Sequence, residues 1–303
     1  MNTIVLGSRG SNLALWQANF IRRLLQENID NVRVEIEVIK TRGDHIQDKP
    51  IPVIGGKGLF TKEIEDALLD ERIHIAVHSL KDIPSTLPEG LVYAGSPLRA
   101  DCRDTFISTR WNSLKDVPER GRIATGSMRR RALVLGQKPT LTCENLRGNI
   151  DTRLRKLEEE DWDGIIMAAA ALDRLRLKHR VTEYLDPEIF VPSVGQGAIG
   201  LEVKENREDM LTALKKITHQ ETVDAVKAER AFMRHLEGGC SVPIGAWGRH
   251  VNGQLHLTGY FASVDGKKYI RETVYGPPEK PEALGFQLAE QFLAHGVKEF
   301  VSR

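Results

Sequence analysis

Arginines and small polar residues gather at three places where a predicted strand ends and a predicted helix begins. The segments are Gly7-Ser-Arg-Gly-Ser11, Thr125-Gly-Ser-Met-Arg-Arg130 and Leu146-Arg-Gly-Asn149, with Arg153 one helical turn after the last. Ser11, Ser127 and Asn149 are of the residue types that cap helix N-termini. Because free N–H groups beside a guanidinium form an anion site, three such turns favour a ligand with several negative charges.

Arg129 and Arg130 fall in the first turn of a predicted helix, where the helix dipole disfavours a cation. We therefore expect an anion between them. The stretch from Arg99 to Arg180 holds 14 of the 26 arginines; its 18 basic and 12 acidic residues give +6, against −5 for the rest. Arginine suits bidentate binding of carboxylate or phosphate, although a solvated surface would give the same count.

Asp82 is the candidate for acid–base chemistry, because it follows an apolar strand and lies between Leu80 and Ile83. Burial would raise the pKa of such a carboxyl, and the neighbouring Lys81 would lower it. A carboxylate at a strand's end can exchange a proton or stabilise a passing cation. A turn-capping aspartate is the alternative interpretation.

Cys240 follows a predicted helix on a Gly-rich loop and could be a covalent attachment point, whereas Cys102 and Cys143 are expected to be passive. The three cysteines form no CxxC, and no Cys/His cluster has ligand spacing, so neither a disulfide scaffold nor a metal site is predicted. His74 and His78 lie on a predicted strand and are interpreted as core or hydrogen-bonding residues.

Two phosphate-binding motifs are matched only superficially. Residues 195–200 read GxGxxG, but Pro192-Ser193 precede them and a strand-like run follows, which is the wrong context for a dinucleotide site. The segment 55–58 is Gly-rich without Walker spacing, and a mobile loop ending at Phe60 fits it better.

The elements that must position these residues alternate between strand and helix. The order βαβαβ over residues 3–77, and its return over 105–175, predict parallel sheets with helices on their faces. The helix 12–27 is expected to turn Leu13, Trp16, Phe20 and Leu24 toward the core. A helix over 221–236, three strand-like runs and a helix over 281–294 predict a small α+β domain. No internal repeat is found.

The composition is that of a soluble protein of two or three domains. The 303 residues are 41% apolar and 28% charged, with a net charge of +1. No apolar run approaches the roughly 18 residues needed to span a bilayer. The N-terminus lacks the features of a signal peptide, so a cytoplasmic location is expected.

These motifs together resemble the hydroxymethylbilane synthase, or porphobilinogen deaminase, family. The matching segments run in order from residue 8 to 245: SRGSNLALWQ, KTRGD, GGKGLFTKEIE, AVHSLKDIP, RDTFIS, TGSMRRR, LRGNIDTRL, GIIMAAAALDRL, VPSVGQGAIG and ERAFMRHLEGGCSVPIG. Two departures are small: Gly126 stands where a second Ser is expected, and Cys102 stands where Pro is common.

The resemblance implies an α/β fold with two type II periplasmic-binding-protein-like domains and a small C-terminal α+β domain. The expected domains are 1–98 with 198–216, then 99–197, then 217–303. The segments near 98–102 and 192–198 are expected to act as hinges.

The resemblance also implies a transferase carrying a dipyrromethane cofactor, joined to Cys240 by a thioether. Four porphobilinogen molecules are added one at a time, each losing ammonia to give an azafulvene that the terminal pyrrole attacks, and water then releases 1-hydroxymethylbilane. By resemblance, the catalytic residues are Asp82, Arg9 and Lys81. Those that bind the cofactor are Cys240, Ser79, Lys81, Asp82, Thr125, Ser127, Arg129, Arg130, Arg147 and Gly148. Those that bind substrate are Arg9, Ser11, Arg147, Arg153, Arg174, Gln196 and the loop residues Lys57 and Phe60.

Two other classes of function are weighed against this one. A non-catalytic anion-binding or effector-sensing protein of the same double-lobed fold would need the arginines but neither Asp82 nor a group on Cys240. A nucleic-acid-binding protein is disfavoured by the net charge of +1 and by the few aromatics near the arginines. The resemblance thus implies porphobilinogen as the partner and a monomer as the oligomeric state, and no nucleic acid, membrane or metal is expected.

Overall fold

The computed structural model describes residues 3–45, 61–236 and 242–300, and the chain divides into two compact units. The first unit comprises Met1–Ala100 and Ala198–Val223, and the second comprises Asp101–Gly197 and Asp224–Arg303. The C-terminal part therefore clusters with the Arg-rich part. The boundaries expected at 98, 197 and 216 between three domains stay a prediction.

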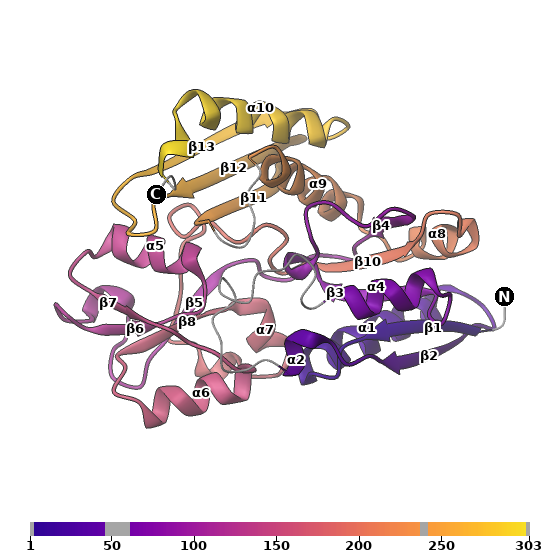
Figure 1. Ribbon diagram of the computed structural model, residues 1–303, viewed down its shortest axis with the longest axis horizontal. Coiled ribbons are helices and arrows are strands. Elements are labelled where there is room, and N and C mark those ends of the chain that lie inside the picture. The colour runs from indigo at the N-terminus through magenta and orange to yellow at the C-terminus, as the bar shows by residue number, and fades with distance from the viewer. Residues whose placement is uncertain (1–2, 46–60, 237–241, 301–303) are drawn as a thin grey trace. The chain divides into compact units, whose positions relative to one another are not determined.

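A five-stranded mixed sheet forms the first unit. Its spatial order is β2 (Arg33–Val38), β1 (Thr3–Ser8), β3 (Ile75–Ser79), β10 (Ile199–Lys204) and β4 (Leu91–Gly95). Its helices are α1 (Asn12–Asn28), α2 (Arg42–His45), α4 (Lys62–Leu69) and α8 (Glu208–Lys215), labelled in Figure 1. The sequence predicted a parallel sheet, but β10 runs antiparallel to both neighbours because it enters after the chain returns from the second unit.

The second unit repeats this arrangement in the order β7 (Thr142–Glu144), β6 (Arg122–Ala124), β8 (Gly164–Ala168), β5 (Asp104–Ile107) and β9 (Glu183–Tyr184). Its helices are α5 (Met128–Gln137), α6 (Ile150–Glu159) and α7 (Ala169–Arg174). Here β5 is the antiparallel strand, and it too is the first strand after the chain enters the unit. The two sheets therefore share one strand order, although the sequence contains no repeat.

Helix α1 begins at the N-cap Ser11, whose side chain accepts a hydrogen bond from Ala14 N–H, as the sequence predicted. Trp16, Phe20 and Leu24 of the predicted face do pack against the core of this unit, but they are not its most buried residues. The fully buried residues are Gln17, Ala18, Ile21 and Leu25, whereas Leu13, Trp16, Phe20 and Leu24 are only half-buried. The apolar stripe is broad, so periodicity alone did not locate its centre. Moreover, the buried face includes a polar residue, Gln17, that hydrogen-bonds across to β3.

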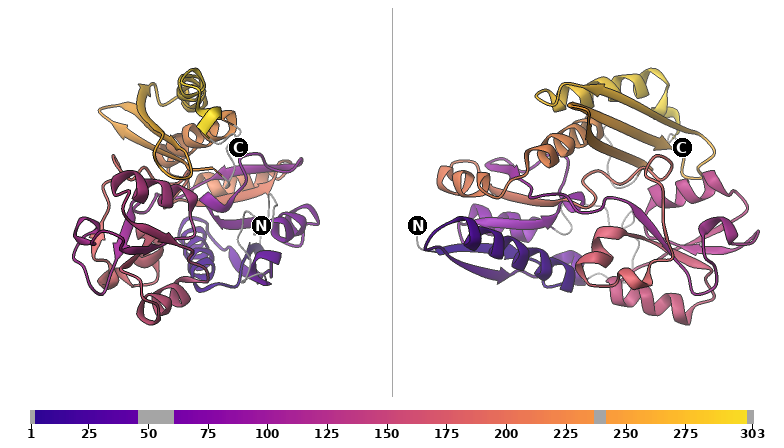
Figure 2. Two further views of the ribbon diagram at one scale, coloured as in Figure 1. Left: turned by 60° about the vertical axis from the view of Figure 1, so that its left-hand side comes forward. Right: turned by 180° about the vertical axis from the view of Figure 1, so that it is seen from behind.

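The C-terminal part of the second unit is the α+β domain that the sequence predicted. Three antiparallel strands, β11 (Ile244–Val251), β12 (Gln254–Ala262) and β13 (Tyr269–Gly276), lie beside α10 (Pro281–Ala294), as both views in Figure 2 show. Helix α9 (Gln220–His235) joins the same core through Phe232, which packs edge-to-face against Phe292. None of the described helices is long and apolar enough to cross a membrane.

Candidate functional site

A pocket of about 60 Å³ opens in the first unit at the carboxyl ends of β1 and β3. Four of its lining residues are predicted site residues: Arg9, Ser11, Ser79 and Asp82. The others are Leu13, Ala14, Gln17, Val77 and His78. The first arginine-bearing turn and the candidate acid–base residue therefore share one pocket, beside the capped start of α1.

Asp82 ends a short 3-10 turn, Leu80–Asp82, that follows β3 directly. Leu80 and Ile83 are buried and anchor the turn, but the side chains of Lys81 and Asp82 are exposed. The Asp82 carboxyl is therefore not buried, so the burial that was considered from the sequence does not occur. An exposed carboxylate on a buried anchor suits contact with a ligand better than a structural capping role.

Gln17 is a pocket residue that the sequence reasoning missed. Its Nε2 donates to Ser79 Oγ at 2.9 Å, which joins the first turns of α1 to the end of β3. Its amide is 1% exposed, so the bond is shielded from water. A polar residue inside an otherwise apolar helical face was the available signal.

The second and third arginine-bearing turns lie against each other in the second unit. Ser127 caps α5 by accepting from Arg130 N–H, and Asn149 caps α6 by accepting from Thr152 N–H, which confirms both predicted caps. A Cβ at Gly126 would come within 2.5 Å of the Leu146 carbonyl oxygen. Glycine therefore replaces the expected serine at a point where these two turns approach closely.

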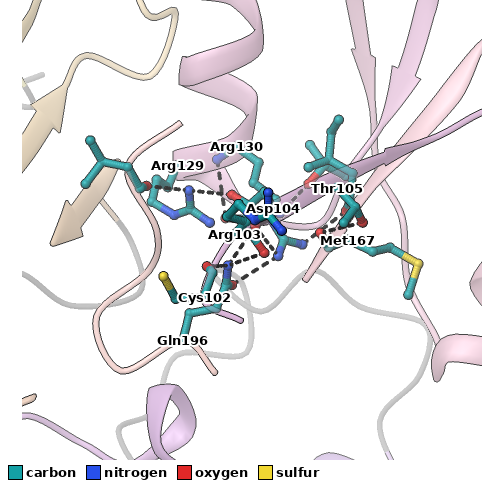
Figure 3. A network of polar contacts seen from close by, with 12 residues as sticks. Cys102, Arg103, Asp104, Thr105, Arg129, Arg130, Met167 and Gln196 are labelled. Carbon is teal, nitrogen blue, oxygen red and sulfur yellow. Dashed lines mark hydrogen bonds and ion pairs between the residues drawn. The ribbon is translucent and has the colours of Figure 1, made fainter. Parts of the chain in front are cut away.

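Arg129 and Arg130 have the anion that the sequence required, and it is a residue of the chain (Figure 3). Asp104, at the start of β5 and fully buried, accepts from Arg129 Nη1 at 2.8 Å and from Arg130 Nε at 3.0 Å. Burial alone would raise the pKa of the Asp104 carboxyl, but the two guanidiniums hold that pKa well below its usual range. Asp104 was missed because strand β5 is distant in sequence from α5.

Gln196 is tied into the same network (Figure 3). Its Nε2 donates to Asp104 Oδ1 at 2.9 Å and to the Cys102 carbonyl at 2.8 Å, and its Oε1 accepts from Arg130 Nη2 at 3.2 Å. The amide is 1% exposed, so these protein groups occupy it. Its predicted contact with substrate stays a prediction.

The remaining predicted residues of the second unit border these turns. Thr125 is buried and its hydroxyl accepts from Ser127 N–H, while the Gly148 carbonyl accepts from Arg153 Nε at 2.8 Å. Arg174 donates from Nη2 to the Gly197 carbonyl, and burial lowers the pKa of its guanidinium to about 10. Arg147 is half-buried, burial lowers the pKa of its guanidinium, and no residue of the described segments pairs with it.

Lys57, Phe60 and Cys240 lie outside the described residues, so their predicted roles stay predictions. The structure agrees with setting aside the GxGxxG match at residues 195–200, whereas the Gly-rich segment 55–58 lies outside the described residues. The strand β10 follows residues 195–198 directly, where a dinucleotide site would need a helix. His74 Nδ1 accepts from Val5 N–H, and buried His78 lies 3.0 Å from Glu202. No cluster of metal ligands is found in the parts of the chain that the structure covers.

Cys143 is buried, and burial raises the pKa of its thiol to about 11. At pH 8 only about one such thiol in a thousand is ionised, and the thiolate is the nucleophile. We therefore expect iodoacetamide at pH 8 to leave Cys143 of the native protein unmodified long after free glutathione has reacted, as peptide mass mapping would show. After unfolding in urea the same residue should react fully. Modification of native Cys143 at the glutathione rate would contradict its passive role.

Comparisons with known proteins match nearly the whole chain to one family. A family model described as porphobilinogen deaminase, dipyromethane cofactor binding domain, matches residues 4–212, and one for the C-terminal domain matches residues 223–294. The porphobilinogen deaminase of Syntrophotalea carbinolica is 45% identical over 297 residues, covering 98% of this chain and 94% of that protein. That of Alkaliphilus metalliredigens is 46% identical over 301 residues, covering 99% and 95%. Among solved structures, the methionine-binding protein MetQ is 12% identical with a TM-score of 0.46, covering 76% of this chain and 91% of MetQ.

Proposed function

The chain belongs to the porphobilinogen deaminase family. We propose that the pocket of the first unit acts on the reacting pyrrole, and that the arginine-bearing turns of the second unit bind the carboxylates of cofactor and product. The chain is a hydroxymethylbilane synthase, a transferase of tetrapyrrole biosynthesis that uses a dipyrromethane cofactor. The observation that carries the residue assignment is the pocket in which Arg9, Ser11, Ser79 and Asp82 meet.

Asp82 is the residue of this pocket that handles charge on the reacting pyrrole. Loss of ammonia leaves a cationic pyrrole, and an exposed carboxylate at the pocket wall stabilises that cation or moves its proton. Arg9 and the capped N-terminus of α1 bind a carboxylate of the same substrate and thereby orient it. Ser79, fixed by Gln17, and Lys81 support that orientation.

The turns of the second unit hold the side-chain carboxylates of the growing product. Each porphobilinogen unit brings an acetate and a propionate, so the anionic charge rises with every addition. Arg147 is the strongest candidate, because it is half-buried and none of the described residues pairs with it. The adjoining capped turns contain Ser127, Gly148 and Arg153. Arg174 donates to the carbonyl of Gly197, the residue that follows Gln196.

The dipyrromethane cofactor, joined to Cys240, fits the second unit by charge and by reach. Gly245 of β11 approaches Arg129 so closely that a Cβ there would lie 3.1 Å from Arg129 Cδ. Cys240 precedes Gly245 by five residues, which span at most about 18 Å of extended chain. Arg129 and the start of α5 would hold its carboxylates, and Arg130 would support Arg129 through Asp104. When bound, the group supplies the free pyrrole carbon to which the first substrate is added.

The finer features of this enzyme also belong to the proposal. It acts as a monomer in the cytoplasm, binds no nucleic acid or membrane, and has domains at 1–98 with 198–216, at 99–197 and at 217–303. The near-neutral charge supports the absence of nucleic acid, since phosphate backbones select proteins with a strong basic excess. Lys57 and Phe60 are proposed to cover the reacting groups and exclude water.

The assignment is tested by product stoichiometry. Purified protein incubated with porphobilinogen is expected to release one ammonia per substrate consumed and one linear tetrapyrrole per four. A non-catalytic anion-binding protein of the same fold would bind porphobilinogen without releasing ammonia, and that result would refute the proposal.

A further inference from the structure

Asp104 lies where two arginines of the second unit converge, and no role was predicted for it from the sequence. It is fully buried, and its two oxygens are divided between the arginines: Oδ2 accepts from Arg129, and Oδ1 accepts from Arg130. A carboxylate shared in this way fixes the direction of both guanidiniums. Figure 3 shows the three side chains converging at the start of β5.

The two arginines differ in how many of their guanidinium nitrogens have a hydrogen-bond partner among the described residues. Arg130 has used all three of its nitrogens: Nε on Asp104, Nη1 on the Ile166 carbonyl at 3.0 Å and Nη2 on Gln196. Arg129 uses Nη1 twice, on Asp104 and on the Val191 carbonyl at 2.7 Å. Its Nε is buried and has no hydrogen-bond partner among the described residues. Arg129 as a whole is only 4% exposed, so water does not replace that partner.

The charges of these three side chains do not cancel. Two guanidiniums and one carboxylate leave a single positive charge, at the N-terminus of α5, where the helix dipole adds to it. A buried donor without a partner and an uncompensated buried charge are both costly unless a further anion binds. One ligand carboxylate would satisfy both.

We propose that Asp104 is the positioning residue of this site, aligning Arg129 and Arg130 so that one positive charge, on Arg129, remains for one ligand carboxylate. Arg130 is then a supporting residue and Arg129 is the one that meets the ligand. The inference deepens the proposed function and rests on it, since it assumes that this turn holds a carboxylate of the cofactor.

The same carboxylate also ties together two segments where the chain passes between the units. Gln196 bonds Asp104 Oδ1 and the carbonyls of Cys102 and Arg103, while the unit boundaries fall at 100/101 and 197/198. Filling the site should therefore stiffen both segments, because the carboxylate, the arginines and Gln196 form one connected network.

The test is cofactor loading, followed by intact mass after porphobilinogen is added to protein made without cofactor. Asp104→Asn removes the charge but keeps the shape, so the two guanidiniums repel each other and lose their alignment. We expect at least tenfold slower loading at a temperature where near-ultraviolet circular dichroism matches the wild type. Asp101→Asn, at the half-exposed Asp101–Arg103 pair, should load at the wild-type rate. The double variant Asp104→Asn with Gln196→Glu, which exchanges amide and carboxylate, should recover most of the rate.

Two results would overturn the inference. A folded Asp104→Asn protein that loads at the wild-type rate shows that alignment is unnecessary, and a failure of the wild type itself to load would instead refute the proposed function. Hydrogen exchange on the wild type does not depend on any variant's folding. Loading should protect amides in residues 102–106 and 191–196, and unchanged exchange there would also overturn the inference.

Discussion

Replacing Asp82 by alanine is expected to lower turnover of porphobilinogen about a thousandfold while leaving the fold intact. The side chain is exposed, so its removal disturbs no packing, and Leu80 and Ile83 keep the turn in place. What is lost is the only carboxylate among the described pocket residues, and removing one electrostatic or acid–base group typically costs a factor of about 10² to 10⁴. Steady-state turnover, with circular dichroism as the folding check, measures the effect.

The chain contains a matched control for this variant. Leu114–Asp116 is a second 3-10 turn with the same sequence Leu-Lys-Asp, again with a buried Leu114 and an exposed Asp116. Asp116→Ala should leave turnover unchanged. Asp82→Glu retains the carboxylate but displaces it, so about a hundredfold loss is expected. Full activity in Asp82→Ala would remove this residue from the mechanism.

Replacing Arg147 or Arg130 by leucine should separate ligand binding from folding. Arg147 has no partner in the segments the structure describes, so Arg147→Leu should fold normally and lose only its bond to a ligand carboxylate. A charge-assisted hydrogen bond contributes about 1.5–3 kcal/mol, which corresponds to cofactor loading weakened about 10- to 150-fold. Loading is followed by intact mass, and folding by urea denaturation.

Arg130→Leu is expected to show the opposite pattern. It leaves Asp104 buried with one partner fewer, and breaking a buried pair destabilises proteins by about 3–5 kcal/mol. Arg155→Leu, on the exposed face of α6, is the control that should change neither measurement. Normal loading by Arg147→Leu, or unchanged stability in Arg130→Leu, would refute this division of roles.

Local sequence patterns predicted the elements and the capped turns well. Helix α10 has the predicted bounds, and Ser11, Ser127 and Asn149 cap the helices they were expected to cap. These features depend on a few neighbouring residues, so the sequence contains them. Strand β4 and helix α8 were not predicted.

Features set by long-range contacts were missed or interpreted differently. The anion between Arg129 and Arg130 was anticipated as a ligand, yet Asp104 supplies it from 25 residues away along the chain. Likewise, strand β10 is antiparallel because it follows a whole second sheet, which βαβ patterns nearby cannot indicate. Such pairings arise only when distant segments meet, and one sequence gives no local sign of them.

The intact mass of the purified protein tests the central claim most directly. If the chain carries a dipyrromethane on Cys240, its mass exceeds the 34.0 kDa of the polypeptide by two linked pyrrole units, and Cys240→Ser lacks the excess. A wild-type protein with the bare polypeptide mass that gains nothing when porphobilinogen is added, or an excess that survives in Cys240→Ser, would contradict the account.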